Sequence, residues 1–165
     1  MATDPLLTAL QNLEVFRGLD QEQLAEIARK AERIVFKPGQ TVVEAGAQGD
    51  GAFLLVAGDA EVLPDERQTN HPRGNRQPVV PGSLVGEMAM LIEHEYRITV
   101  VACSSIRALK ITRAQMQALM LAAPVVAEHF VSRISSRLSR VAVELRRIDQ
   151  MLAIATESNP VGQQP

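Results

Sequence analysis

The chain has 165 residues, of which 46% are hydrophobic, and this predicts one folded domain with an appendage. Its formal net charge of −2 gives no general attraction to nucleic acid or to an anionic membrane. The single cysteine, Cys103, excludes a disulfide framework and a cysteine-based metal site, and it favours a reducing, cytoplasmic setting. No apolar run approaches the roughly 20 residues that a membrane helix needs.

Two short helices are predicted before the core of the domain. Apolar residues recur at helical spacing over 6–16, and Gly18 follows as the end of this helix. Asp20 can then accept hydrogen bonds from the first turn of a second helix over 21–31. This region therefore predicts a helical pair.

Short apolar segments alternate with glycine-bearing turns from residue 32 onward. Pro38-Gly39 and Pro81-Gly82 are turn signatures, because proline fixes the first corner and glycine accepts a positive φ. This spacing predicts an antiparallel roll or barrel, with loops at 45–51 and 64–76 and a buried Cys103. The predicted strands are 33–36, 41–44, 52–57, 60–63, 77–80, 97–103 and 106–111.

Helical patterns return after the last strand. Thr112 caps a helix over 113–122, and Pro124 opens a long final helix that ends near Ala155. We therefore divide the chain into a β-roll domain at 1–122, a dimerisation helix at 123–155 and a disordered tail at 156–165. The apolar residues of the helix follow steps of three and four, as in a coiled coil: Leu138, Val141, Leu145, Ile148, Leu152 and Ala155.

The stretch from Leu84 to Val101 carries the candidate chemistry. It places one acid, Glu87, ten positions before one base, Arg97, with an apolar run and a polar turn at 93–95 between them. A cation at the entrance of a strand is costly unless an anionic group meets it. We interpret the stretch as a loop and short helix that hold a phosphate, with Arg97 as its counter-charge.

The order of these elements, with G-E-M-A-M-L-I-E-H-E-Y-R at the centre, resembles the cyclic nucleotide-binding domain family. The bacterial catabolite-activator type is the most similar, since its acid and base are also ten residues apart. The resemblance covers about residues 15–152. It implies an α+β fold, in which N-terminal helices and a long C-terminal dimerisation helix flank an antiparallel, jelly-roll-like β-roll.

The resemblance also implies a ligand site. Glu87 would accept a hydrogen bond from the ribose 2′-hydroxyl, and Arg97 would meet the phosphate. Backbone N–H groups of the turn would point at the same phosphate, and Gly86 would let the backbone approach it. The remaining members of this phosphate cassette are Met88 and Ala89.

The residues after the arginine bear on which ligand is preferred. Ile98 and Thr99 follow Arg97 and are included in the predicted site. In the family, a hydroxyl residue directly after the arginine accompanies a preference for cGMP. Its absence here favours cAMP.

Two positions on the final helix are candidates for a contact to the base or for an ion pair. Arg137 falls at the arginine position of that helix. Its side chain could contact Glu87 or the base, be solvated, or form an ion pair with another chain. Val141 and Ala142 fall where the family offers hydroxyls to the adenine. The resemblance therefore gives no hydroxyl route to the base.

The sequence is compatible with three functions of different classes. The leading one is a non-enzymatic cAMP-binding regulatory module that signals through its helix and homodimer to an unknown effector protein. The alternative is a ligand-free scaffold of the same fold, which Ile98, Val141 and Ala142 favour. No second recognition-helix pattern or basic patch follows the long helix, so we expect no direct nucleic-acid binding.

An enzyme of the cupin type is the third function. It would need clustered histidines and a carboxylate to hold a metal. His71, His94 and His129 are dispersed, so no metal site and no catalytic residue is assigned.

Overall fold

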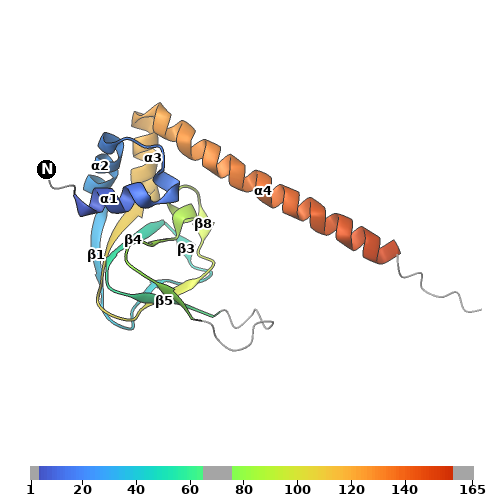
Figure 1. Cartoon of the computed structure of the whole chain (residues 1–165), viewed down its shortest axis with the longest axis horizontal. Helices are drawn as coiled ribbons and strands as arrows, with labels where there is room; N and C mark the ends of the chain where they lie inside the picture. Colours follow the sequence, from blue (N-terminus) through green and yellow to red (C-terminus); the bar gives the residue numbers. More distant parts are fainter. Residues whose placement is uncertain (1–3, 65–75, 158–165) are drawn as a thin grey trace, which may run out of the picture. The chain divides into compact units, whose positions relative to one another are not determined.

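The computed structural model describes residues 4–64 and 76–157, and it confirms the predicted α+β class with an antiparallel roll (Figure 1). These residues fall into two compact units, one that runs to Ala127 and one that begins at Glu128. The predicted loop at 64–76 lies outside the described residues except at its two ends.

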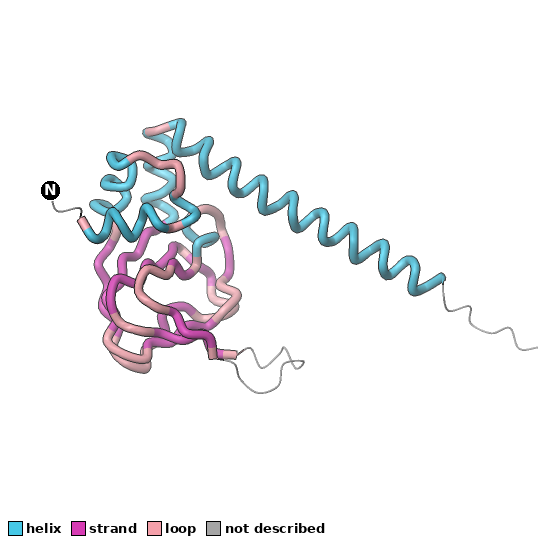
Figure 2. Tube along the Cα trace, in the orientation of Figure 1, coloured by secondary structure: helices cyan, strands magenta, loops and turns pink. Residues whose placement is uncertain are grey.

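Antiparallel strands build the first unit (magenta in Figure 2). In the described residues they are β1 (Glu32–Phe36), β2 (Thr41–Val43), β3 (Gln48–Gly49), β4 (Gly51–Ala57), β5 (Ala60–Leu63), β6 (Gln77–Val79), β7 (Leu84–Val85), β8 (His94–Glu95), β9 (Thr99–Ala102) and β10 (Ile106–Thr112). One four-stranded sheet has the order β1-β10-β4-β7, and a second has the order β2-β9-β5-β6. β3 and β8 pair with each other as a separate ladder.

Side chains from both four-stranded sheets form the core of the roll. Phe53 and Leu55 on β4 join it, whereas Ala52 and Leu54 are buried on the other face of the same strand. Burial on both faces explains why β4 is a continuous apolar run rather than an alternating one. The core comprises Val42, Val43, Phe53, Leu55, Ala60, Val79, Val85, Ala89, Tyr96, Val100, Ala102, Ile106 and Ala108.

The β3–β8 ladder is the main departure from the predicted strands. It joins the predicted loop at 45–51 to the predicted turn at 93–95, through Gln48 opposite Glu95 and Gly49 opposite His94. These two-residue strands consist of polar residues and glycine, so they carry no hydrophobic alternation that could predict them. Their pairing is set by contacts distant in sequence.

The strand predicted over 97–103 is also shorter than expected. β9 covers only Thr99–Ala102, so Arg97 precedes the strand rather than opening it. Cys103 lies in the following turn and is exposed, so its predicted burial is wrong. Its backbone N–H donates to the carbonyl of Asp59 at 2.9 Å, which joins the turn between β9 and β10 to the turn between β4 and β5.

Helices gather at one end of the roll (Figure 1). They are α1 (Pro5–Asn12), the 3-10 turn η1 (Glu14–Phe16), α2 (Gln21–Lys30) and α3 (Arg113–Ala122). The helix predicted over 6–16 is interrupted at Leu13, which is extended, and continues only as η1. Capping boxes at Asp20 and Thr112 begin α2 and α3, since each side chain accepts the N–H three residues on.

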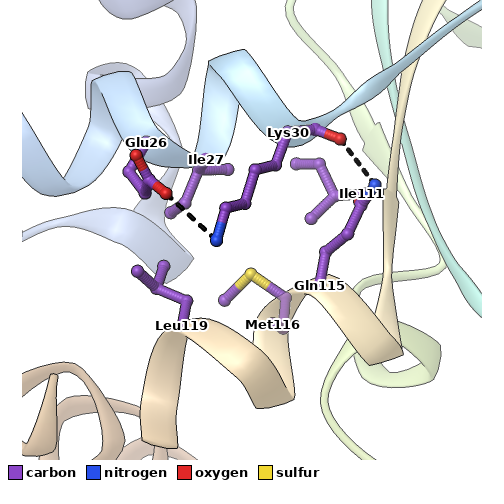
Figure 3. A pocket seen from close by; sticks show the side chains of 7 residues that line it. All are labelled: Glu26, Ile27, Lys30, Ile111, Gln115, Met116 and Leu119. Atoms are coloured by element: carbon purple, nitrogen blue, oxygen red, sulfur yellow. Dashed lines mark hydrogen bonds and ion pairs between the residues drawn. The ribbon is translucent and has the colours of Figure 1, made fainter. Parts of the chain in front are cut away.

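Gln115 fixes α3 against α2 (Figure 3). Its Oε1 accepts from the Thr112 N–H at 3.0 Å, and its Nε2 donates to the Lys30 carbonyl at 2.5 Å. One side chain thus satisfies a backbone N–H at the start of α3 and a backbone carbonyl at the end of α2. The small pocket between the helices is lined by Glu26, Ile27, Lys30, Ile111, Gln115, Met116 and Leu119.

The second unit consists of the helix α4 (Pro124–Glu157) from Glu128 onward. The helix runs two residues beyond its predicted end at Ala155, and the rest of the predicted tail lies outside the described residues. Its predicted seam is exposed to solvent along its length, with Leu145 57% exposed. None of the helices in the described residues combines the length and hydropathy needed to cross a membrane.

Shortening a buried side chain on the central strand β4 should destabilise the roll. Leu54→Ala removes a side chain that is fully buried on β4, so we expect a loss of about 3 kcal/mol in the free energy of unfolding. Val35→Ala on β1, where the side chain is 63% exposed, is the control and should cost under about 0.5 kcal/mol. Urea denaturation measures both, and equal losses would contradict the assigned core.

Candidate functional site

The predicted cassette forms a turn and a short 3-10 helix, as expected. β7 pairs with β4 and delivers the chain to Gly86, which has φ +80° and ψ +30°. The 3-10 helix η2 (Glu87–Met90) follows at once. This left-handed conformation costs a residue with a Cβ about 1–2 kcal/mol, so glycine suits the position.

The structure places the acid and the base on different segments. Glu87 is the first residue of η2 and is half-buried, whereas Arg97 is exposed between β8 and β9. Within the described part of the chain, no carboxylate pairs with Arg97. Met88 is half-buried and Ala89 is fully buried in the core of the roll.

Tyr96 brings these two segments together. Its ring lies against Gly86, so close that a Cβ on that glycine would be 2.6 Å from the tyrosine Cε1. Gly86 directly precedes Glu87, and Tyr96 directly precedes Arg97. Two parts of the predicted cassette that are ten residues apart in sequence are therefore neighbours in space.

The two residues after Arg97 differ in environment. Ile98 is 42% exposed although it is apolar. Thr99 is half-buried, and its Oγ1 accepts a hydrogen bond from the Ala45 N–H at 3.0 Å. This bond ties the start of β9 to the loop after β2.

The phenol of Tyr96 is anchored at the start of β4. It donates to the carbonyl of Gly51 at 2.7 Å. Burial raises the pKa of the Tyr96 hydroxyl above its usual value, and the Asp50 carboxylate adds to the rise, whereas the bond to Gly51 opposes it. The hydroxyl therefore stays a donor throughout the neutral pH range.

Arg113, which the sequence interpretation missed, holds the far end of η2. Its Nη1 donates to the carbonyls of Gly49 at 2.9 Å, Ala89 at 3.2 Å and Ile92 at 3.2 Å. Its backbone N–H donates to the Asp50 carbonyl at 2.7 Å. A cation is favourable beside carbonyls at the end of a helical turn. Arg113 thus connects the cassette, the β3–β4 junction and the start of α3.

The two candidates on the final helix belong to the second unit. Arg137 and Val141 both lie on α4 and are exposed. Ala142 beside them is half-buried. These placements leave the predicted roles of Arg137 and Val141 as predictions.

The site carries no arrangement typical of a metal centre. Across residues 4–64 and 76–157, no group of three or more His, Cys, Asp or Glu side chains is placed to hold a metal ion. His94 is on β8 and His129 is on α4, while His71 falls outside the described residues.

Comparisons with known proteins agree on the kind of domain. The family model described as cyclic nucleotide-binding domain matches residues 33–123, which is more than half of the chain. That span begins in β1, includes all of β2–β10 and the cassette, and ends one residue after α3.

Three solved structures share this architecture. A cyclic nucleotide-binding-like protein from Brucella abortus has 26% identity and a TM-score of 0.63, over 71% of this chain and 98% of its own. The N-terminal domain of a transcriptional regulator from Streptomyces coelicolor has 22% identity and a TM-score of 0.70, over 83% of this chain and 94% of its own. The Thermus thermophilus catabolite activator protein has 24% identity and a TM-score of 0.61, over 82% of this chain and 62% of its own. The last two support the fold alone.

Removing the Arg113 guanidinium should destabilise the first unit. Arg113→Gln leaves carbonyls of Gly49, Ala89 and Ile92 without their charged donor, so we expect a loss of about 2 kcal/mol in the free energy of unfolding. Arg107→Gln, at an exposed site on β10, is the matched control and should change it by less than about 0.5 kcal/mol. Similar values for the two variants in chemical denaturation would rule out this anchoring role.

Proposed function

This chain belongs to the cyclic nucleotide-binding domain family, and we propose on that premise that it binds cAMP in the cassette of residues 86–89 and Arg97. The observation that carries the proposal is Arg97, which is exposed and has no carboxylate partner in the described residues. It directly follows Tyr96, whose ring lies against the Gly86 turn. A cyclic nucleotide carries one phosphodiester charge, which a guanidinium meets with two directed hydrogen bonds.

Glu87 is the proposed ribose contact. Its carboxyl oxygens can accept a hydrogen bond from the 2′-hydroxyl. A deoxyribonucleotide lacks this donor. Because Glu87 is half-buried at the start of η2, a ligand there would lie partly out of water, where a hydrogen bond to a charge is stronger.

The preference for cAMP over cGMP is part of the proposal. It is supported by Ile98, which puts an exposed apolar side chain where a hydroxyl would accompany cGMP binding. The hydroxyl of Thr99 is not a free substitute for the missing one, since its Oγ1 already accepts a hydrogen bond from the Ala45 N–H. Arg137 and Val141 stay candidates for contacts to the base or for an ion pair.

A regulatory module needs an output, and we propose that α4 supplies it by forming a homodimer. The support is the exposed seam at Leu138, Val141, Leu145, Ile148 and Leu152, whose steps of three and four suit a two-stranded coiled coil. Ligand binding would then bias the arrangement of the two helices, and an effector protein would respond to that arrangement. This role is non-enzymatic and is proposed for the cytoplasm.

A ligand-free scaffold of the same fold is the second candidate. Ile98 and Thr99 favour it, because neither offers an unused polar group beside Arg97. Such a scaffold would keep α4 as an assembly surface and would gain no stability from a cyclic nucleotide.

Arg97→Ala should weaken cAMP binding by about 10- to 100-fold, because a hydrogen bond to a charged group is worth about 1.5–3 kcal/mol. Isothermal titration calorimetry measures the affinity. Arg107→Ala removes an exposed cation from β10 and should leave the affinity unchanged. If cAMP, cGMP and cyclic dinucleotides all give no heat and no rise in Tm with the unmodified chain, the scaffold function is favoured.

Leu145→Glu should convert a dimer into a monomer, because it puts a charge in the centre of the seam. Light scattering after size-exclusion chromatography gives the mass directly. Val143→Glu is the matched control, since Val143 is similarly exposed on α4 but lies off the seam. A monomeric unmodified chain, or equal effects of the two variants, would contradict dimerisation through this face.

A further inference from the structure

Tyr96 is the only tyrosine in the chain, and it makes contacts in several directions next to Arg97. Its backbone N–H donates to the Ala47 carbonyl at 3.0 Å, and its own carbonyl accepts from the Gly46 N–H at 2.8 Å. Its side chain is buried, with 9% of its surface exposed. The backbone that leads into Arg97 is therefore held on both sides by the loop after β2.

The ring of Tyr96 fits between two glycines from separate segments. A Cβ on Gly86 would be 2.6 Å from its Cε1, and a Cβ on Gly49 would be 2.9 Å from its Cζ. Real Cβ atoms do not approach so closely, so neither glycine can carry a side chain while the ring stays in place. The ring thus occupies the space that side chains at positions 49 and 86 would need.

The hydroxyl of Tyr96 fixes the depth of the ring. It donates to the Gly51 carbonyl at 2.7 Å, at the start of β4. Arg113 holds the Gly49 carbonyl in the same junction. Because the pKa of the phenol is raised, the hydroxyl stays protonated and remains the donor in this hydrogen bond. The anchor therefore lies at the start of the buried strand β4 rather than in the cassette.

We propose that Tyr96 is a positioning residue for the ligand site, which sets the separation between Glu87 and Arg97 by holding the Gly86 turn and the Arg97 backbone on one anchor at 49–51. The inference rests on the proposed function, because it concerns the affinity of the same cassette. A phosphate and a ribose in one small ligand are a fixed distance apart, so a cassette held at that distance binds without first being ordered.

This role makes a specific claim about affinity. A loosened anchor lets the two halves of the cassette drift, so that only a fraction of molecules is ready to bind, and the apparent dissociation constant rises by the inverse of that fraction. A purely structural tyrosine would lower the stability of the fold and leave the affinity of the folded protein unchanged.

The test compares Tyr96→Phe with Val79→Ala. Tyr96→Phe keeps the ring between the glycines and removes only the bond to Gly51. Val79 is buried in the same core on β6 and serves as the control for a general loss of stability. We expect calorimetry at a temperature where both variants are folded to give cAMP binding about fivefold weaker for Tyr96→Phe and unchanged for Val79→Ala.

A second measurement uses the unmutated core. Incorporation of fluorotyrosine gives one fluorine NMR resonance, because the chain has a single tyrosine. We expect cAMP to shift this resonance with the same midpoint as the calorimetric titration. In Arg97→Ala protein the shift should require correspondingly more cAMP.

The outcomes separate the two proposals. If cAMP binds the unmodified chain, but Tyr96→Phe binds it equally well and the resonance does not move, Tyr96 has no positioning role and the proposed function stands. If Tyr96→Phe and Val79→Ala weaken binding alike, the effect is general stability and the inference is wrong. If the unmodified chain binds no cyclic nucleotide, the proposed function fails and this inference fails with it.

Discussion

The close approach of backbone around Tyr96 is the constraint on which the candidate site depends. Glycines at 49 and 86 leave room for the ring, and the carbonyl of Gly51 fixes its hydroxyl. Because this junction opens β4, the central apolar strand, the cassette is fastened to a part of the roll that is buried on both faces. The residues that would contact the ligand are therefore positioned by their attachment to the core of the roll.

Two arginines on the same unit show how environment assigns different tasks to one side chain. Arg113 is half-buried and its guanidinium donates to backbone carbonyls, so its charge is used within the fold. Arg97 is exposed at the entrance of β9, with no carboxylate partner among the described residues. An exposed guanidinium without such a partner is suited to an anionic ligand. The proposed phosphate contact thus follows from where the fold satisfies its charges.

Local patterns predicted most of the fold, and long-range contacts account for what they missed. The alternation of short apolar runs with glycine turns identified the roll, and the Glu87 to Arg97 spacing identified the family that the domain comparison confirms. The β3–β8 ladder escaped, because its residues become strands only through pairing with a segment more than 40 positions away. Cys103 was wrongly placed in the core, since an apolar neighbourhood in sequence does not show where a strand ends. Arg113 gave only one signal, its place directly after the Thr112 cap.

The central claim is that Glu87 and Arg97 bind opposite ends of one cyclic nucleotide. A crystal structure of the chain grown with cAMP tests it most directly. The account predicts phosphate oxygens within about 3 Å of the Arg97 guanidinium and the ribose 2′-hydroxyl at the Glu87 carboxylate. Density for the nucleotide elsewhere on the roll, or none beside Arg97 at saturating cAMP, would contradict it.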